Sequence, residues 1–166
     1  MPHFIARFCI ILTAVSAFSA PAVRATTITP QGVGPVKLGA RYADLQAKGL
    51  VGPIGPGCEL AGPNTRAAKL RPPLKGSVDF TLTEPRRAAT ITVNGGATAR
   101  GVGVGSTSRA LKTAFPAAKF DHSSDEVFLA TFVRVPRSGG GPIAFAVSTK
   151  TKRVQQIAIP NLAVCE

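Results

Sequence analysis

The chain has 166 residues, with 20 Lys and Arg against 8 Asp and Glu, and a formal net charge of +12. This length suits one domain with a sizeable core. The sequence contains no Trp and one Tyr, so no set of aromatic side chains accompanies the arginines, and we expect no nucleic-acid binding. The positive charge instead favours anionic polymers or lipid headgroups as partners, or a solvated basic surface.

Residues 1–25 are expected to form a secretory signal peptide. Arg7 gives this segment a positive start, residues 8–20 are apolar, and small residues fit the cleavage pattern after Ala22 and after Ala25. The apolar run is about a dozen residues long, whereas a membrane-spanning helix needs about 20. An uncleaved anchor is the alternative. Cleavage would give a secreted, extracytoplasmic protein without a transmembrane segment.

A first module is predicted over residues 26–94. Its helix, over 41–48, has apolar positions at helical spacing and stops at Gly49. The range 52–63 is rich in Gly and Pro and is expected to be irregular. Strands are predicted over 67–70, 77–83 and 89–94; in the second of these, Val78, Phe80 and Leu82 are expected to face the core.

A second module is predicted over residues 95–166. Ser106 or Thr107 can cap a helix over 108–115, which ends before Pro116. Three strands follow, over 127–135, 143–149 and 153–159. Each module is therefore predicted to be a helix followed by a three-stranded antiparallel meander, an α+β fold with the helices packed on one sheet face.

The two modules share a sequence pattern at an offset of 66 residues. Val36, Leu38, Gly39 and Leu45 recur as Val102, Val104, Gly105 and Leu111. Two further blocks, at 78–82 and 86–93, recur at offsets of 65 and 66. An internal duplication explains three matched blocks in order. The alternative is the apolar alternation common to any β protein.

The Leu-Gly start of this pattern resembles that of small secreted or envelope modules, namely the tandem-repeat β-lactamase-inhibitory protein family and the small outer-membrane assembly lipoproteins. Those families usually continue with Met and then Thr or Ser, so Ser106-Thr107 is closer to them than Ala40-Arg41 is. The resemblance covers nearly all of the mature chain and implies a fold rather than a function. It also implies a disulfide within each repeat and, in the lipoproteins, a lipidated cysteine, neither of which this chain can supply.

Two cysteines, Cys58 and Cys165, remain after cleavage, and an even count in an exported chain predicts a disulfide between them. Such a bridge would close a loop of about a hundred residues and stabilise the fold by about 4–5 kcal/mol in the chain-entropy model. A metal site is the alternative, but two thiols with His122 are a poor ligand set. We expect no metal and no cofactor.

No catalytic constellation emerges from the sequence. His122 lies beside Ser123 and Asp125, but triad members meet through the fold, so a solvated polar loop is the favoured interpretation. The acidic residues of this loop could hold a cation only weakly. The glycines at 101–105 lack the lysine of a phosphate-binding loop. The chain is predicted not to be an enzyme.

Two surfaces are candidates for partner contact. Residues 127–135 are apolar on both faces, so either both faces are covered or Phe128 and Phe132 form a contact patch beside Arg134. The second candidate is basic and consists of two pairs at matching places in the modules, where they would form one edge: Arg86, Arg87, Lys152 and Arg153.

These features predict a secreted, non-catalytic interaction module that acts at the bacterial cell envelope or outside it, through an anionic envelope polymer or a protein partner. The alternative is a secreted inhibitor of an extracellular hydrolase, or an enzyme of unrecognised type. Tight inhibitors rely on Trp, Tyr and Arg anchors, and Tyr42 is the one such aromatic residue in this chain.

Overall fold

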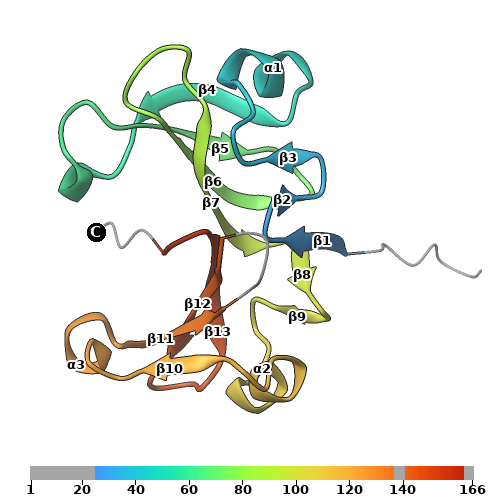
Figure 1. Ribbon diagram of the computed structural model, residues 1–166, viewed down its shortest axis with the longest axis vertical. Coiled ribbons are helices and arrows are strands. Elements are labelled where there is room, and N and C mark those ends of the chain that lie inside the picture. The colour runs from blue at the N-terminus through green and yellow to red at the C-terminus, as the bar shows by residue number, and fades with distance from the viewer. Residues whose placement is uncertain (1–24, 137–140, 163–166) are drawn as a thin grey trace, which may run out of the picture.

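The computed structural model describes residues 25–136 and 141–162, which are mostly β-structure (Figure 1). The first half contains β1 (Thr26–Thr29), β2 (Gly32–Val33), β3 (Val36–Lys37), α1 (Tyr42–Ala47), β4 (Val51–Pro56), the short 3-10 helix η1 (Glu59–Ala61), β5 (Arg66–Leu70), β6 (Lys75–Phe80) and β7 (Ala88–Gly95). The second half contains β8 (Ala97–Ala99), β9 (Val102–Gly103), α2 (Ser108–Ala114), β10 (Lys119–Asp121), α3 (Asp125–Phe128), β11 (Ala130–Val135), β12 (Ile143–Ser148) and β13 (Val154–Ile159). Within the described ranges, no helix is both long and apolar enough to cross a membrane.

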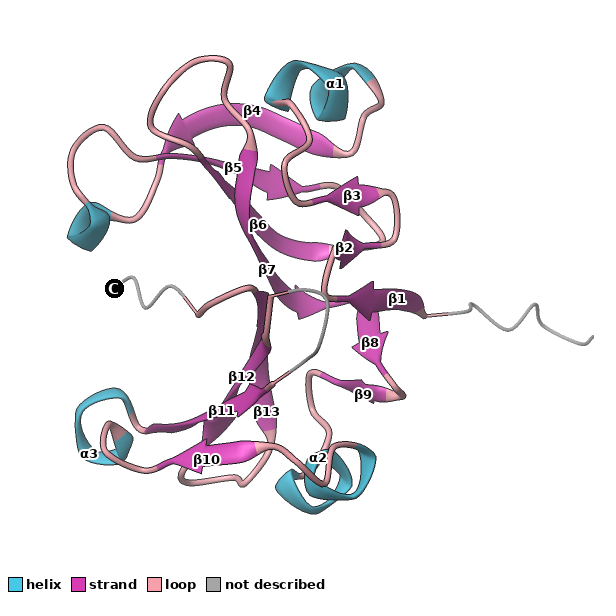
Figure 2. Ribbon diagram, viewed as in Figure 1, coloured by secondary structure: helices cyan, strands magenta, loops and turns pink. Residues whose placement is uncertain are grey.

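The larger sheet has eight strands in the order β10-β11-β12-β13-β7-β6-β5-β4. It consists of two antiparallel groups of four, β4 to β7 and β10 to β13, which meet where β13 pairs with β7. The last three residues of β13 make this joint, with Ile157 opposite Val93 and Ile159 opposite Ile91. Because only short parts of the two strands overlap, the two groups extend from the joint toward opposite ends of the molecule, each with its helix, α1 or α2 (Figure 2).

The smaller sheet also joins the two halves. Its order is β3-β2-β1-β8-β9, so a three-stranded unit from the first half meets a hairpin from the second. The contact is a parallel pair, with Thr26 opposite Ala97 and Thr27 opposite Thr98. The two halves are therefore connected through both sheets.

Both sheets and both long helices contribute to one hydrophobic core. Side chains alternate along a strand, so Val78 and Phe80 of β6 face the core together with Ile91 and Val93 of β7. Helix α2 contributes Leu111, which is fully buried; burial of such a side chain is worth about 1.5–3 kcal/mol. Small residues predominate on the other face of the larger sheet, among them Ala67, Ser77, Thr92, Ala144, Ala146 and Ala158.

The repeated sequence pattern forms the same turn in both halves. Gly39 and Gly105 have φ values of 76° and 89°, a left-handed conformation that glycine adopts without a Cβ clash. Three backbone N–H groups donate across each turn at 2.8–2.9 Å, from Gly39 to Ala88, Ala88 to Ala40 and Tyr42 to Arg86 in the first half, and from Gly105 to Val154, Val154 to Ser106 and Ser108 to Lys152 in the second. The pattern therefore marks the point where each helix is attached to the larger sheet.

The predicted fold, an α+β pair of modules with a helix and three strands each, is wrong. Each half gives four strands to one shared sheet, and the structure is mostly β. Most of strand β4, Val51–Pro56, lies inside the range 52–63, which its prolines and glycines predict to be irregular. Proline is tolerated there because β4 is an edge strand, where a missing N–H need not break a ladder hydrogen bond.

The two long helices agree with the sequence. The helices predicted over 41–48 and 108–115 are Tyr42–Ala47 and Ser108–Ala114. Gly49, at φ 66°, follows the first helix as expected. The strand predicted over 77–83 ends at Phe80, however, and Leu82, expected in the core, is 59% exposed.

Candidate functional site

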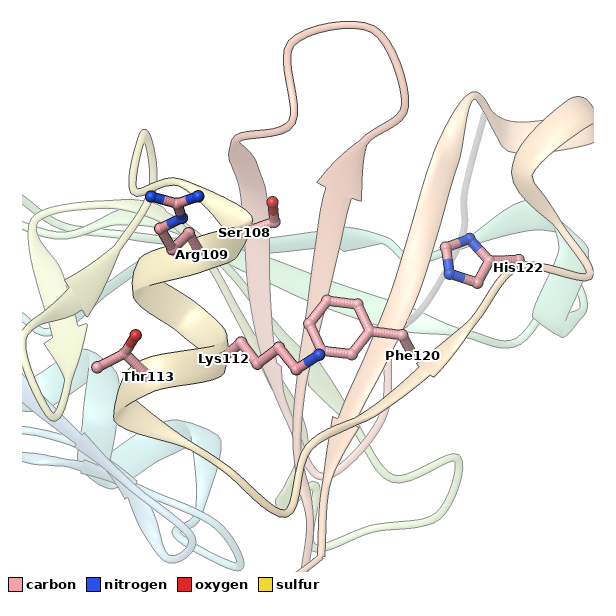
Figure 3. Close-up of a pocket in the computed structure, with 6 residues that line it drawn as sticks. All are labelled: Ser108, Arg109, Lys112, Thr113, Phe120 and His122. Carbon is pink, nitrogen blue, oxygen red and sulfur yellow. The ribbon is translucent and has the colours of Figure 1, made fainter.

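Helix α2 and the end of strand β10 form the walls of an open groove in the second half of the molecule (Figure 3). Its volume is about 530 Å³. The lining residues are Ser108, Arg109, Lys112 and Thr113 from the helix, and Phe120 and His122 from the strand side. Because β10 is the outermost strand of the larger sheet, the groove lies at a sheet edge.

Helix α2 presents its polar residues to the groove. Leu111 is buried on the opposite side of the helix, whereas Arg109, Lys112 and Thr113 occupy positions i, i+3 and i+4 of one exposed face. The helix begins at a capped end, because the Thr107 hydroxyl accepts a hydrogen bond from a first-turn N–H at 3.2 Å. This cap, which the sequence predicts, satisfies a backbone donor that would otherwise lack a partner.

Strand β10 supplies the opposite wall. Phe120 packs against the core, and His122 follows two residues later with 70% of its side chain exposed. The His122 Nδ1 lies 2.9 Å from Asp125 Oδ2, and this hydrogen bond is the main cause that lowers the pKa of the Asp125 carboxyl. When Nδ1–H is donated to this carboxylate, Nε2 is the ring nitrogen left for a ligand.

The groove is basic, and none of the described residues that line it is acidic. Among the described residues, no Asp or Glu lies within 4.0 Å of the charged nitrogens of Arg109 or Lys112. A guanidinium presents its N–H groups as a fork that matches carboxylate and phosphate oxygens, and an ammonium adds three donors. An anionic group in the groove can therefore meet donors from Arg109 and Lys112, of which Lys112 extends toward the ring of Phe120 (Figure 3).

A second groove lies at the equivalent place in the first half, between α1, β4 and the connection from β6 to β7. Its volume is about 350 Å³, and its lining residues are Arg41, Tyr42, Ala43, Ile54, Glu84, Pro85 and Arg86. The Tyr42 hydroxyl accepts a hydrogen bond from the Ile54 N–H at 3.0 Å and lies 3.5 Å from the Gly52 carbonyl. The Tyr42 ring therefore lies across the edge of β4.

Three pairs of lining residues correspond at the offset of 66: Tyr42 and Ser108, Ala43 and Arg109, and Ile54 and Phe120. The first groove is thus partly filled by a tyrosine, and a carboxylate, that of Glu84, lines it. The second has a short serine in place of the tyrosine and a cation in place of an alanine. The same architecture gives a smaller groove lined by one carboxylate and two arginines in one half, and a larger groove lined by Arg109 and Lys112 in the other.

No protein-family model, curated protein or solved structure matches this chain. The resemblance to the β-lactamase-inhibitory protein family and the outer-membrane lipoproteins therefore stays a prediction. It rests on the short Leu-Gly motif.

The four basic residues predicted as a surface lie at turns that border strands. Arg86 and Arg87 end the connection between β6 and β7, and Lys152 and Arg153 end the connection between β12 and β13. These connections lie at opposite ends of the molecule (Figure 1). The two pairs therefore do not form one basic edge, because the shared sheet extends in opposite directions from its central joint.

Several of these cations make internal contacts. Arg87 Nη1 donates to the Gly39 carbonyl at 2.9 Å, and Arg153 Nη1 donates to the Gly105 carbonyl at 2.6 Å. Arg86 forms an ion pair of 2.9 Å with the carboxylate two residues before it. In both halves an arginine thus holds the glycine turn that precedes the helix.

The predicted strand over 127–135 is wrong in its first part, because α3 ends at Phe128 and β11 begins at Ala130. Asp and Glu in the first turn of α3 favour a helix start. Leu129 has a left-handed φ of 50°. Val127 and Leu129 are 75% and 67% exposed, and the ring of Phe128, 38% exposed, stacks on Phe132 at 5.6 Å. We refer to Val127, Phe128 and Leu129 as the apolar cluster.

Arg134 does not join the apolar cluster. It lines a separate hollow of about 400 Å³, together with Lys119, Asp121, Phe132 and Asn161 among others. Phe132 therefore contacts the cluster through Phe128 and also borders this hollow. The predicted patch of two phenylalanines and an arginine is divided between two adjoining surfaces.

Two further predictions involve residues outside the described ranges. The signal peptide covers residues 1–25, of which 1–24 are not described, and Cys165 is not described either. Cys58 immediately precedes η1, and its pairing with Cys165 stays a prediction. In the described part of the chain, no three His, Cys, Asp or Glu side chains form a group that could hold a metal ion.

The sequence does not single out Arg109, Lys112 or Phe120 as site residues. These residues belong to no recognisable motif, and only a comparison between the two repeats distinguishes them. Aligning the two halves at the offset of 66 places a tyrosine opposite Ser108 and an alanine opposite Arg109. At these two positions the second half therefore differs from the first in side-chain size and in charge.

Proposed function

We propose that the protein is a non-catalytic binding module that acts outside the cytoplasm and holds anionic groups of a partner in the groove between α2 and β10. The observation that carries this proposal is the pair Arg109 and Lys112, which faces an open groove without an acidic partner among the described residues. The extracytoplasmic location rests on the predicted signal peptide.

Charge and geometry support an anionic ligand. The chain has a large excess of basic residues, with a formal net charge of +12, and a field of this sign concentrates anions near the surface. Hydrogen bonds to a charged group contribute about 1.5–3 kcal/mol each. Two such contacts with Arg109 and Lys112 would distinguish this groove from the exposed lysines elsewhere, which supply charge without an enclosing wall.

The test compares a groove variant with a matched control. The variant carries Arg109→Ser and Lys112→Ser; the control carries Lys48→Ser and Lys69→Ser, which remove the same charge from exposed positions in the first half. Binding of fluorescent polyglutamate and of polyphosphate is measured at about 50 mM and about 500 mM salt. We expect the groove variant to lose at least about tenfold in affinity and the control to lose less than about threefold.

Two outcomes would contradict the proposal. One is the absence of binding to either polymer at low salt. The other is an equal loss in the groove variant and in the control, which would assign binding to net charge alone rather than to the groove. Binding should also weaken steeply at the higher salt concentration, because salt screens exposed charges separated by more than the Debye length.

A second candidate function is contact with a protein through the apolar cluster. Val127 and Leu129 are large, apolar and mostly exposed, and the Leu129 carbonyl accepts hydrogen bonds from the Thr149 N–H at 3.0 Å and hydroxyl at 3.1 Å, which hold the cluster in place. Exposed apolar groups of this kind mark contact sites. Binding through this cluster would persist at high salt and would be lost in Val127→Ser and Phe128→Ser, whereas binding that survives both changes would exclude it.

A further inference from the structure

The two edges of the eight-stranded sheet are protected to different degrees. Strands β4 and β10 are its first and last strands, so within residues 25–136 and 141–162 no strand pairs with the outer side of either one. Such an edge presents backbone N–H and C=O groups that can pair with another extended chain. The residues that cover the outer side of β4 and of β10 therefore indicate at which edge a partner can bind.

The edge of β4 is closed by its own residues. Pro53 and Pro56 have no N–H to offer. The Ile54 N–H points away from β5, because it donates to the Tyr42 hydroxyl at 3.0 Å, and the same hydroxyl lies 3.5 Å from the Gly52 carbonyl. An added strand would have to displace the tyrosine and would find few donors behind it.

The edge of β10 has neither a proline nor a covering tyrosine. Its sequence, Lys119-Phe120-Asp121, contains no proline, and Ser108 stands where the first half has Tyr42. Phe120 is the counterpart of Ile54 at the offset of 66, and it lies opposite Val133 as Ile54 lies opposite Ala68. In an antiparallel ladder, a residue whose N–H points outward also points its C=O outward. The outer edge of β10 therefore offers the N–H and the C=O of Phe120.

We propose that an extended, acidic peptide segment of a partner protein binds along the outer edge of β10 as a ninth strand, with carboxylates held by Arg109 and Lys112. This inference deepens the proposed function and rests on the same groove. Every second side chain of such a strand would face α2, whose groove side carries these two cations. Backbone pairing at Phe120 would fix the direction of the peptide, and the ion pairs would select its acidic composition.

Charge distinguishes this occupant from a second copy of the chain. Antiparallel pairing of β10 with β10 of another molecule would place Lys119 opposite Asp121, but it would also bring the two basic grooves, with Arg109 and Lys112 of both copies, toward each other, and like charges repel. An acidic peptide has the opposite charge and meets no such penalty. A polyanion without a peptide backbone can bind the cations but cannot pair with Phe120.

The test uses the full chain and three probes. The first is a ten-residue peptide in which Glu alternates with Val; the second is the same peptide with alternate backbone amides N-methylated, which removes the donors a strand needs; the third is polyphosphate. We expect the first peptide to bind at least about tenfold more tightly than the methylated one. The variant Ser108→Tyr, which introduces the tyrosine of the first half, should weaken peptide binding at least about tenfold and polyphosphate binding less than about threefold.

The outcomes separate this inference from the proposed function. Equal affinity of the two peptides, with both lost in the Arg109→Ser and Lys112→Ser variant, would overturn strand addition and leave the anionic groove intact. If the wild-type chain and the Arg109→Ser and Lys112→Ser variant bind all three probes equally, both the strand addition and the anionic groove are overturned. Self-association that Ser108→Tyr abolishes would identify a second copy as the occupant and overturn the peptide proposal. If Ser108→Tyr does not fold, the methylated peptide decides the question alone.

Discussion

Strand β4 with helix α1 and strand β10 with helix α2 occupy the two edges of one sheet, and each helix is attached through the same glycine turn. At the first edge, Tyr42 covers the backbone of β4, and Glu84 lines the groove together with Arg41 and Arg86. At the second, Ser108 stands in place of the tyrosine, and Arg109 and Lys112 line the groove. The comparison indicates that the turn and the buried leucines build the scaffold, while a few lining residues decide whether an edge is closed or can bind.

The largest expected effect tests whether the two helices pack equivalently. Leu45 and Leu111 hold matching positions and are 3% and 0% exposed. Leu45→Ala and Leu111→Ala should each lower the free energy of unfolding by about 2–5 kcal/mol, because each leaves a cavity in the core. Urea unfolding measures this, with Leu60→Ala, at a 73% exposed site, as the control. A cost below about 1 kcal/mol at either buried site would contradict the equivalence.

Exchanging the residues at the matching positions 42 and 108 tests whether the tyrosine covers one edge of the sheet. Tyr42→Ser should lower the free energy of unfolding by about 1–3 kcal/mol, since it leaves the Ile54 N–H without its acceptor and removes the edge-on contact with Phe80 at 5.3 Å between ring centroids. Ser108→Tyr should cause no such loss, because its side chain enters an open groove. Thermal unfolding of both variants checks this, and a larger loss in Ser108→Tyr would argue against the open edge.

The N-terminal caps of α1 and α2 differ, and we expect a smaller effect on stability from this difference. The Thr107 hydroxyl caps α2, whereas Arg41 at the same position before α1 provides no side-chain cap. Thr107→Ala should therefore cost about 1 kcal/mol, and Arg41→Thr should add up to about 1 kcal/mol. Chemical denaturation of the two variants measures both values. No gain from Arg41→Thr would show that the first helix depends on other contacts of Arg41.

The smallest expected effects come from two aspartates with opposite pH dependence. Burial raises the pKa of Asp79, so this residue costs stability above its raised pKa and nothing below the ordinary aspartate value. The hydrogen bond from His122 lowers the pKa of Asp125, so its contribution is present above the ordinary value and is lost as the pH falls through the lowered one.

Melting temperatures across this pH range test the two signs. Asp79→Asn should raise the melting temperature at neutral pH and leave it unchanged at about pH 3, where the carboxyl is protonated in both states. Asp125→Asn should lower it slightly at neutral pH. A destabilising effect of Asp79→Asn at neutral pH would mean that the charged carboxylate has a stabilising partner.

Local features of the fold could be predicted from the sequence where one residue type has a specific physical role. Thr107 as a cap, Gly49 as a helix end and the repeated glycine turns follow from hydrogen bonding and backbone conformation, which neighbouring residues decide. The core positions of Val78 and Ile91 follow from alternation along a strand. These predictions need no knowledge of how distant segments meet.

The arrangement of the strands could not be predicted in this way. The pairing of β13 with β7 joins residues far apart in the sequence, and no local pattern marks it. Pro53 and Pro56 argue against a strand at β4, and they fit one only because β4 is an edge strand. The groove cannot be predicted for a related reason, because Arg109 and Phe120 line the same groove only through the placement of α2 beside β10.

Amide hydrogen exchange of Ile54 and Phe120, measured in the same sample, tests most directly whether one edge is closed and the other open. A hydrogen-bonded amide exchanges more slowly than one that faces solvent. In the free protein, Phe120 should exchange at least about tenfold faster than Ile54; the alternating Glu-Val peptide should slow exchange at Phe120 and leave Ile54 unchanged. Equal protection of the two amides in the free protein, or a peptide effect at Ile54 and none at Phe120, would contradict the account.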